Sequence, residues 1–111
     1  MNEEKAALLV GIRHPETEEG LAQALLDELE SLVENIGFTA KIKKLVTVRD
    51  VHPRYHMSAG NAESIAALAR DENVGLIVFD GEISPSQGRN WAELSGIPVF
   101  DREEVILAIF A

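Results

Sequence analysis

The chain has 111 residues, no cysteine and a formal net charge of −9. This length fits one domain, residues 1–111, whose core needs no disulfide or metal. Without cysteine, thiolate catalysis and Cys-ligated metal centres are excluded, and the acidic charge disfavours general binding to nucleic acid, DNA included. The N-terminus lacks a signal-peptide pattern, and no apolar run approaches the roughly 20 residues of a membrane span. These features predict a cytoplasmic protein outside the membrane.

The first apolar run, residues 7–12, predicts a buried strand, and a helix is predicted over Glu16–Asn35. Thr17 is the expected N-cap, and Gly37 is placed for a C-cap. The predicted core face of this helix consists of apolar residues at helical spacing, namely Leu21, Leu25, Leu29, Leu32, Val33 and Ile36.

A second strand is predicted over Phe38–Arg49, with lysines between its apolar residues. The lysines are typical of an edge strand kept soluble by charge. The alternative is a local RNA site, because the positive charges gather here: Lys41, Lys43, Lys44, Arg49 and Arg54. We favour the edge strand.

A loop over Asp50–Gly60 leads to a helix from about Asn61 to Asp71, and residues 75–80 read as a buried strand. The next helix starts with Ser84 as cap, Pro85 at the first position and Gln87 closing a capping box. A short strand over residues 97–100 follows, and Asp101 opens a last helix with a second capping box. The order β-α-β-α-β-α-β-α predicts an α/β domain with a four-stranded parallel sheet and helices on both faces.

The stretch Asp80-Gly81-Glu82-Ile83-Ser84-Pro85-Ser86-Gln87-Gly88-Arg89-Asn90 is the most specific in the chain. It resembles the signature of the N-terminal domain of the HflX-type GTPases, and the tail from Asp101 to Ala111 is similar to the end of that domain. The resemblance implies a domain that precedes a helical linker and a GTPase domain, in proteins that associate with the large ribosomal subunit.

The sequence departs from the family pattern at a turn, at Gly81, which stands where a second acid is usual, and at Gly88, which replaces a polar residue. Ser58, Ala59 and Asn61 occupy a turn where the family carries glycine and lysines, which weakens an inherited contact with phosphates. The sequence also has no G-x-x-x-x-G-K-[ST] phosphate loop, so no GTP hydrolysis is expected of this chain.

Ligands of parallel sheets bind beyond the carboxyl ends of the strands, where Asp80, Glu82 and Asp101 are expected. Paired carboxylates could hold Mg²⁺, but helix capping by Asp101 and a turn at Asp80 explain them without a ligand. We therefore predict no metal and no cofactor. The same edge supplies the other candidates for contact with a ligand or partner: Ser84, Ser86, Gln87, Arg89 and Asn90.

Arg89 is expected to pair with Asp80 or Glu82 and fix the loop, with ligand contact as the alternative. His52 and His56 are separated by Pro53, so they do not form a helical metal motif. Trp91 and Leu94 are expected in the core.

The last helix is apolar all round, although a helix on a sheet buries only one side. We expect Ile106, Ile109 and Phe110 to form an interface with a linker, a GTPase domain or a second copy, and a homodimer in the isolated chain. The favoured function is a non-catalytic binding or regulatory module. The alternative is a small-ligand or nucleotide-binding domain that uses helix N-termini at the carboxyl edge of the sheet.

Overall fold

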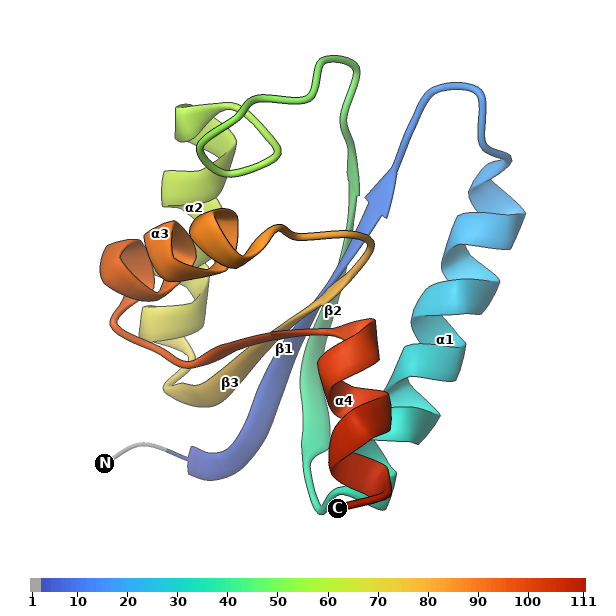
Figure 1. Ribbon diagram of the computed structural model, residues 1–111, viewed down its shortest axis with the longest axis vertical. Coiled ribbons are helices and arrows are strands. Elements are labelled where there is room, and N and C mark those ends of the chain that lie inside the picture. Colours follow the sequence, from blue (N-terminus) through green and yellow to red (C-terminus); the bar gives the residue numbers. More distant parts are fainter. Residues whose placement is uncertain (1–2) are drawn as a thin grey trace.

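The sheet consists of four parallel strands in the order β2-β1-β3-β4 (Figure 1). Their bounds are β1 Glu3–Arg13, β2 Thr39–Thr47, β3 Val74–Asp80 and β4 Val99–Asp101. The computed structural model describes residues 3–111. β1 and β3 lie in the middle of the sheet, and their central residues, 6–12 and 74–79, are all apolar or glycine, as a strand covered on both faces requires. The predicted fold class is confirmed.

Two helices cover each face of the sheet (Figure 1). Their bounds are α1 Glu19–Asn35, α2 Ala59–Asp71, α3 Pro85–Ser95 and α4 Arg102–Ile109. The core under α1 and α4 is built around Leu9, Leu26 and Val78, and the core under α2 and α3 contains Phe79 and Trp91. Leu94 packs against the second core, so the core prediction for Trp91 and Leu94 is confirmed.

Three helices begin as their sequences predict or within two residues of it. Ser84 and Asp101 cap α3 and α4 with complete capping boxes, and Ser58 caps α2 by accepting from the Asn61 amide. The prediction of Thr17 as the cap of α1 is wrong, because Thr17 closes a turn with His14 and the helix begins after Glu18. The Arg13 guanidinium holds this turn by donating to the Thr17 carbonyl at 2.8 Å.

The core face of α1 is displaced from the predicted one. Leu29 and Val33 are buried, but Leu21 and Leu25 are 54% and 38% exposed. The buried stripe instead starts with Ala22 and Leu26, one residue further along, which turns the face by about 100°. Ala22 and Leu26 are 5% and 1% exposed, so this stripe is the buried one, and Arg102 of α4 reaches the Leu25 carbonyl on the neighbouring side of α1.

β2 is an edge strand, and this prediction is confirmed. Two of its three lysines reach sideways to the helices: Lys43 pairs with Asp27 and Glu30 of α1, each at 2.8 Å, and Lys41 pairs with Glu72 after α2. Two of the five positive charges are therefore neutralised, which argues against an RNA site on the strand itself.

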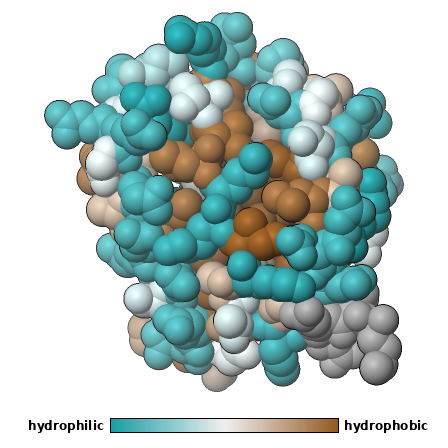
Figure 2. All heavy atoms as spheres, turned by 180° about the vertical axis from the view of Figure 1, so that it is seen from behind, coloured by the Kyte–Doolittle hydropathy of each residue, from teal (hydrophilic) through white to brown (hydrophobic). Residues whose placement is uncertain are grey.

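Seen from behind, the molecule shows apolar atoms in the middle of the view, bordered by hydrophilic ones (Figure 2).

Candidate functional site

The carboxyl ends of β3 and β4 meet at one edge of the sheet. Phe79 pairs with Asp101 in the strand register, so Asp80 and Asp101 come from neighbouring strands, as the sequence predicts. Their carboxylates nevertheless have separate tasks. The Asp101 carboxylate accepts from the Glu104 amide at 2.8 Å, and Glu104 accepts in return from the Asp101 amide at 3.1 Å. Asp101 is therefore the helix cap that the sequence indicates.

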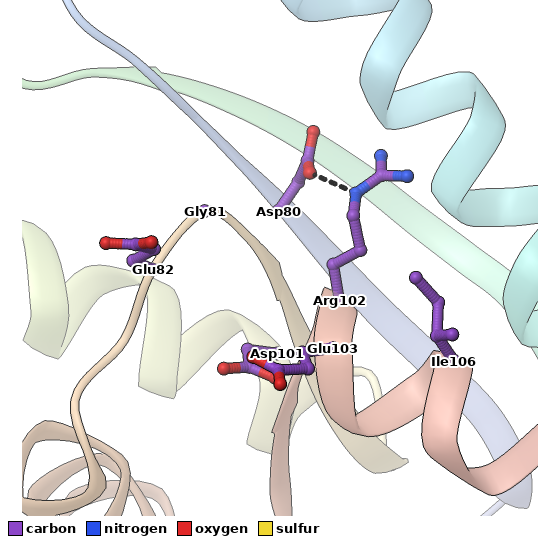
Figure 3. A pocket seen from close by; sticks show the side chains of 7 residues that line it. All are labelled: Asp80, Gly81, Glu82, Asp101, Arg102, Glu103 and Ile106. Carbon is purple, nitrogen blue, oxygen red and sulfur yellow. Dashed lines mark hydrogen bonds and ion pairs between the residues drawn. The ribbon is translucent and has the colours of Figure 1, made fainter.

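Arg102 holds the Asp80 carboxylate (Figure 3). Its Nε donates to Asp80 at 2.8 Å, while its two terminal nitrogens donate to the Glu28 carboxylate at 2.7 Å and the Leu25 carbonyl at 2.6 Å. Burial opposes the charge of Arg102, but the hydrogen bonds with Asp80 and Glu28 outweigh it and raise its pKa. One guanidinium thus ties together α1, the end of β3 and α4.

The prediction that Arg89 pairs with Asp80 or Glu82 is therefore wrong. Arg89 is exposed on α3 and makes no ion pair with the residues that the structure describes, whereas Arg102 lies at the first turn of α4 beside Asp80. Asp80 points toward Arg102, and Glu82 extends from the following loop in another direction (Figure 3). This divergence argues against hydrolase or transferase chemistry by the carboxylates. Within residues 3–111, no group of three potential metal ligands occurs.

A cavity of about 300 Å³ opens beside this ion pair (Figure 3). Its walls come from the β3–α3 loop and the start of α4: Asp80, Gly81, Glu82, Asp101, Arg102, Glu103 and Ile106. Gly81 has φ of +146°, which strongly favours glycine, and an added Cβ would lie 3.5 Å from Ile12.

The polar residues of α3 are used inside the protein. Gln87 Nε2 donates to the carbonyls of His52 and Pro53 at 3.4 and 3.2 Å. Asn90 Nδ2 donates to the Arg54 carbonyl at 2.9 Å, and Trp91 Nε1 donates to the Tyr55 carbonyl at 3.1 Å. Three side chains on one face of α3 therefore hold four consecutive carbonyls of the loop before α2. We call this arrangement the loop clamp.

The two serines of the signature shape the start of the same helix. Ser84 Oγ accepts from the Gln87 amide at 3.1 Å, and Gln87 Oε1 accepts from the Ser84 amide at 2.9 Å. The hydroxyls of Ser84 and Ser86 lie 3.2 Å apart. The signature therefore acts mainly as a structural device. Its spacing of i, i+3 and i+4 at Gln87, Asn90 and Trp91 is the signal from which the clamp could have been found.

The clamped loop forms a tight turn between two histidines. His52 and His56 exchange both backbone hydrogen bonds, and His56 has φ of +70°. The His56 ring lies edge-on to the His14 ring, 5.6 Å between centroids, and its Nε2 is buried without a hydrogen-bond partner. Burial first, and His14 second, lower the pKa of His56 below its ordinary 6.5. The ring is therefore held in the neutral form.

The outer side of α4 remains uncovered. Val105 is fully buried against the sheet and Ile109 is partly buried, but Ile106, Leu107 and Phe110 are 36%, 64% and 83% exposed. We call these three residues the α4 face. The predicted interface residues Ile106 and Phe110 are thus available to a partner, while Ile109 contributes mostly to the domain's own packing.

This fold, with its signature loop and helix at the carboxyl edge, matches a known class of domain. The model of a family described as "GTP-binding GTPase N-terminal" matches residues 23–111. The chain therefore belongs to this family, the N-terminal domains of the HflX GTPases. The GTPase HflX of Akkermansia muciniphila is 45% identical over 95% of this chain, and that of Escherichia coli strain K12 is 36% identical over 78%.

The relatives are much longer than this chain, which spans 24% of the Akkermansia protein and 20% of the Escherichia one. A crystal structure of a variant of SsGBP has a TM-score of 0.68 at 18% identity, covering 96% of this chain and 32% of that one. A GTP-binding protein from Sulfolobus solfataricus, crystallised with GDP, has a TM-score of 0.64 at 20% identity over 96% of this chain and 30% of that one. At these identities the structural likeness supports the fold.

Proposed function

We propose that this domain is a non-catalytic regulatory module of an HflX-type protein and docks against the part that follows it through the α4 face. The supporting observation is the contrast at the carboxyl edge: many of its polar groups are used in caps, in the loop clamp and in the Arg102 ion pairs, while the α4 face stays apolar and exposed. Surfaces of this kind commonly mark interfaces. A second copy of the chain is another possible occupant.

The test uses the Akkermansia relative as a host. This chain replaces the N-terminal quarter of that GTPase, and GTP turnover is compared with the full-length parent and with a form lacking the domain. We expect the replacement to restore the parent's turnover and the isolated chain to hydrolyse no GTP. A rate in the isolated chain that disappears on substitution of its own residues would contradict the proposal, as would equal turnover with and without the domain.

Association with the large ribosomal subunit, in the cytoplasm, is a further part of the proposal and rests on the family resemblance. None of the helices in the described part of the chain is long and apolar enough to cross a membrane. Co-sedimentation of the hybrid protein with purified large subunits tests the association. If the hybrid stays in the supernatant while the parent sediments, this domain does not support ribosome binding.

Binding of a small ligand or nucleotide at the carboxyl edge is the second candidate, favoured by the cavity of about 300 Å³. Its lining carries four carboxylates and one guanidinium that already pairs with Asp80, so it repels phosphates. Thermal melting with millimolar GTP or ATP and Mg²⁺ distinguishes the candidates. A rise in melting temperature would favour the nucleotide site, and we expect none.

A further inference from the structure

The α4 face continues toward α1. Ile106 projects from α4 toward α1 and lines the cavity beside the Asp80–Arg102 pair (Figure 3). Arg102, one turn earlier, donates to the carbonyl of Leu25, whose side chain is exposed on α1. Leu21 lies one turn before Leu25 and is more than half exposed. The uncovered apolar surface therefore runs along two adjacent helices instead of ending at α4.

Negative charge surrounds this surface. Glu103 and Glu104 are exposed on the first turn of α4, and Glu82 lines the cavity from the β3–α3 loop. Arg102 is already paired with Asp80 and with Glu28 of α1, so its charge is compensated within the domain. An apolar strip with an acidic border fits a partner that has an apolar stripe and basic flanks.

The size of the α4 face decides between a second copy and a tethered partner. Stable interfaces usually bury about 800 Å² on each side, more than three side chains provide. A segment of the same polypeptide needs far less surface, because tethering supplies an effective concentration in the millimolar range.

We infer that the α4 face and the adjoining leucines of α1 hold a basic amphipathic helix from the part of the protein that follows this domain. This inference rests on the proposed function and specifies the chemistry of the docking partner. The helix places apolar side chains at i, i+3 or i+4 and i+7 on the strip, and its lysines or arginines face Glu82, Glu103 and Glu104.

The test titrates the isotope-labelled 111-residue chain with a synthetic amphipathic helix, followed by amide NMR shifts. The peptide has about 18 residues, enough for a helix, with a leucine stripe and lysine flanks. The control peptide carries glutamate in place of every lysine. We expect the basic peptide to shift amides of α4 and the first half of α1, and the acidic peptide to bind at least about tenfold more weakly. Equal binding of both peptides, or shifts centred elsewhere, overturns the inference.

Matched variants locate the contact. Leu107→Ser and Phe110→Ser should each weaken the basic peptide about tenfold or more, since truncation of central anchors typically costs this much. Val51→Ser removes a side chain that is 57% exposed on the clamped loop and should leave the affinity unchanged. Light scattering gives the mass of the free chain: a dimer that Leu107→Ser returns to 12.2 kDa makes a second copy the occupant. Peptide binding at α4 without restored GTP turnover in the hybrid keeps the docking site and rejects the regulatory role.

Discussion

Helices α3 and α4 start in the same way and then differ. Each opens with a complete capping box, Ser84 with Gln87 and Asp101 with Glu104. Gln87 and Asn90 of α3 then turn toward the preceding loop and hold it, while Ile106 and Leu107 of α4 are exposed to solvent. Residue polarity alone is therefore a poor guide to burial at this edge. A side chain at this edge becomes buried when a neighbouring segment has backbone groups for it to bond, as the loop before α2 does for α3. Where no segment of residues 3–111 lies alongside, as on the outer side of α4, even apolar side chains stay exposed.

Among the residues of α3 and α4, substitution of Trp91 should cause the largest loss of stability. It is fully buried, lies 4.8 Å from the Phe79 ring between centroids and donates to the Tyr55 carbonyl. Trp91→Ala should lower the free energy of unfolding by about 3–5 kcal/mol, measured by urea denaturation. Trp91→Phe keeps much of the volume and removes the donor, so its loss should be clearly smaller. Equal losses in the two variants would mean that the lost hydrogen bond to the Tyr55 carbonyl, and not the lost volume, explains the destabilisation.

Arg102 tests whether α4 is held by charge as well as by Val105. Arg102→Met keeps an apolar stem but leaves the partly buried Asp80 carboxylate without its cation, and unfolding should become easier by about 1–3 kcal/mol. The measurement is urea denaturation at low salt, because urea is uncharged and does not screen ion pairs. Lys44→Met, which removes an exposed cation from β2, is the control. A similar small effect in both would show that the Arg102 pairs contribute little.

Gln87 tests the loop clamp directly. Gln87→Ala removes one acceptor for the Ser84 amide and two donor contacts with loop carbonyls, so it should cost about 1–2 kcal/mol of stability. Hydrogen exchange should also rise at the amides of the loop over residues 50–57. Arg89→Ala is the matched control on the same helix and should change stability by less than about 0.5 kcal/mol. A loop that stays protected in Gln87→Ala would disprove the clamp.

Acid should weaken the clamped loop through His56. Because the folded-state pKa lies below 6.5, the unfolded chain binds the proton more readily, so stability is lost as the pH falls through 6.5 toward the folded-state value. Unfolding free energies between about pH 7.5 and pH 5 should decline less steeply in His56→Gly, which also suits the positive φ. His52→Gln on the same loop should retain the slope of the parent. An unchanged slope in His56→Gly would exclude His56 as its source.

The α4 face should give the smallest change in stability. Phe110→Ser removes a side chain that is 83% exposed, so the free energy of unfolding should shift by no more than about 0.5 kcal/mol. Thermal and urea unfolding check this. A large loss would mean that Phe110 supports the fold and that the uncovered surface is smaller than it looks.

Local signals were readable from the sequence and distant ones were not. Capping by Ser84 and Asp101 is decided within four residues, and alternating elements determine a parallel sheet, so both were predicted. Arg102 binds partners 22, 74 and 77 residues away, which no local pattern reveals. The error at Leu21 and Leu25 has a related cause. Both leucines continue the spacing of Leu29 and Leu32, and only the packing of α1 on the sheet decides that the stripe with Ala22 and Leu26 is buried.

The position of β1 in the sheet has a consequence for folding during translation. β1 comes first along the chain but lies inside the sheet, with β2 on one side and β3 on the other. On a ribosome, β1, α1 and β2 can pair as soon as they emerge, yet the second edge of β1 stays open until Val74–Asp80 has left the exit tunnel. Because β1 carries apolar side chains, its unpaired edge in the incomplete sheet can pair with strands of other chains. A pause in translation between α2 and β3 would therefore endanger folding more than a pause after β3.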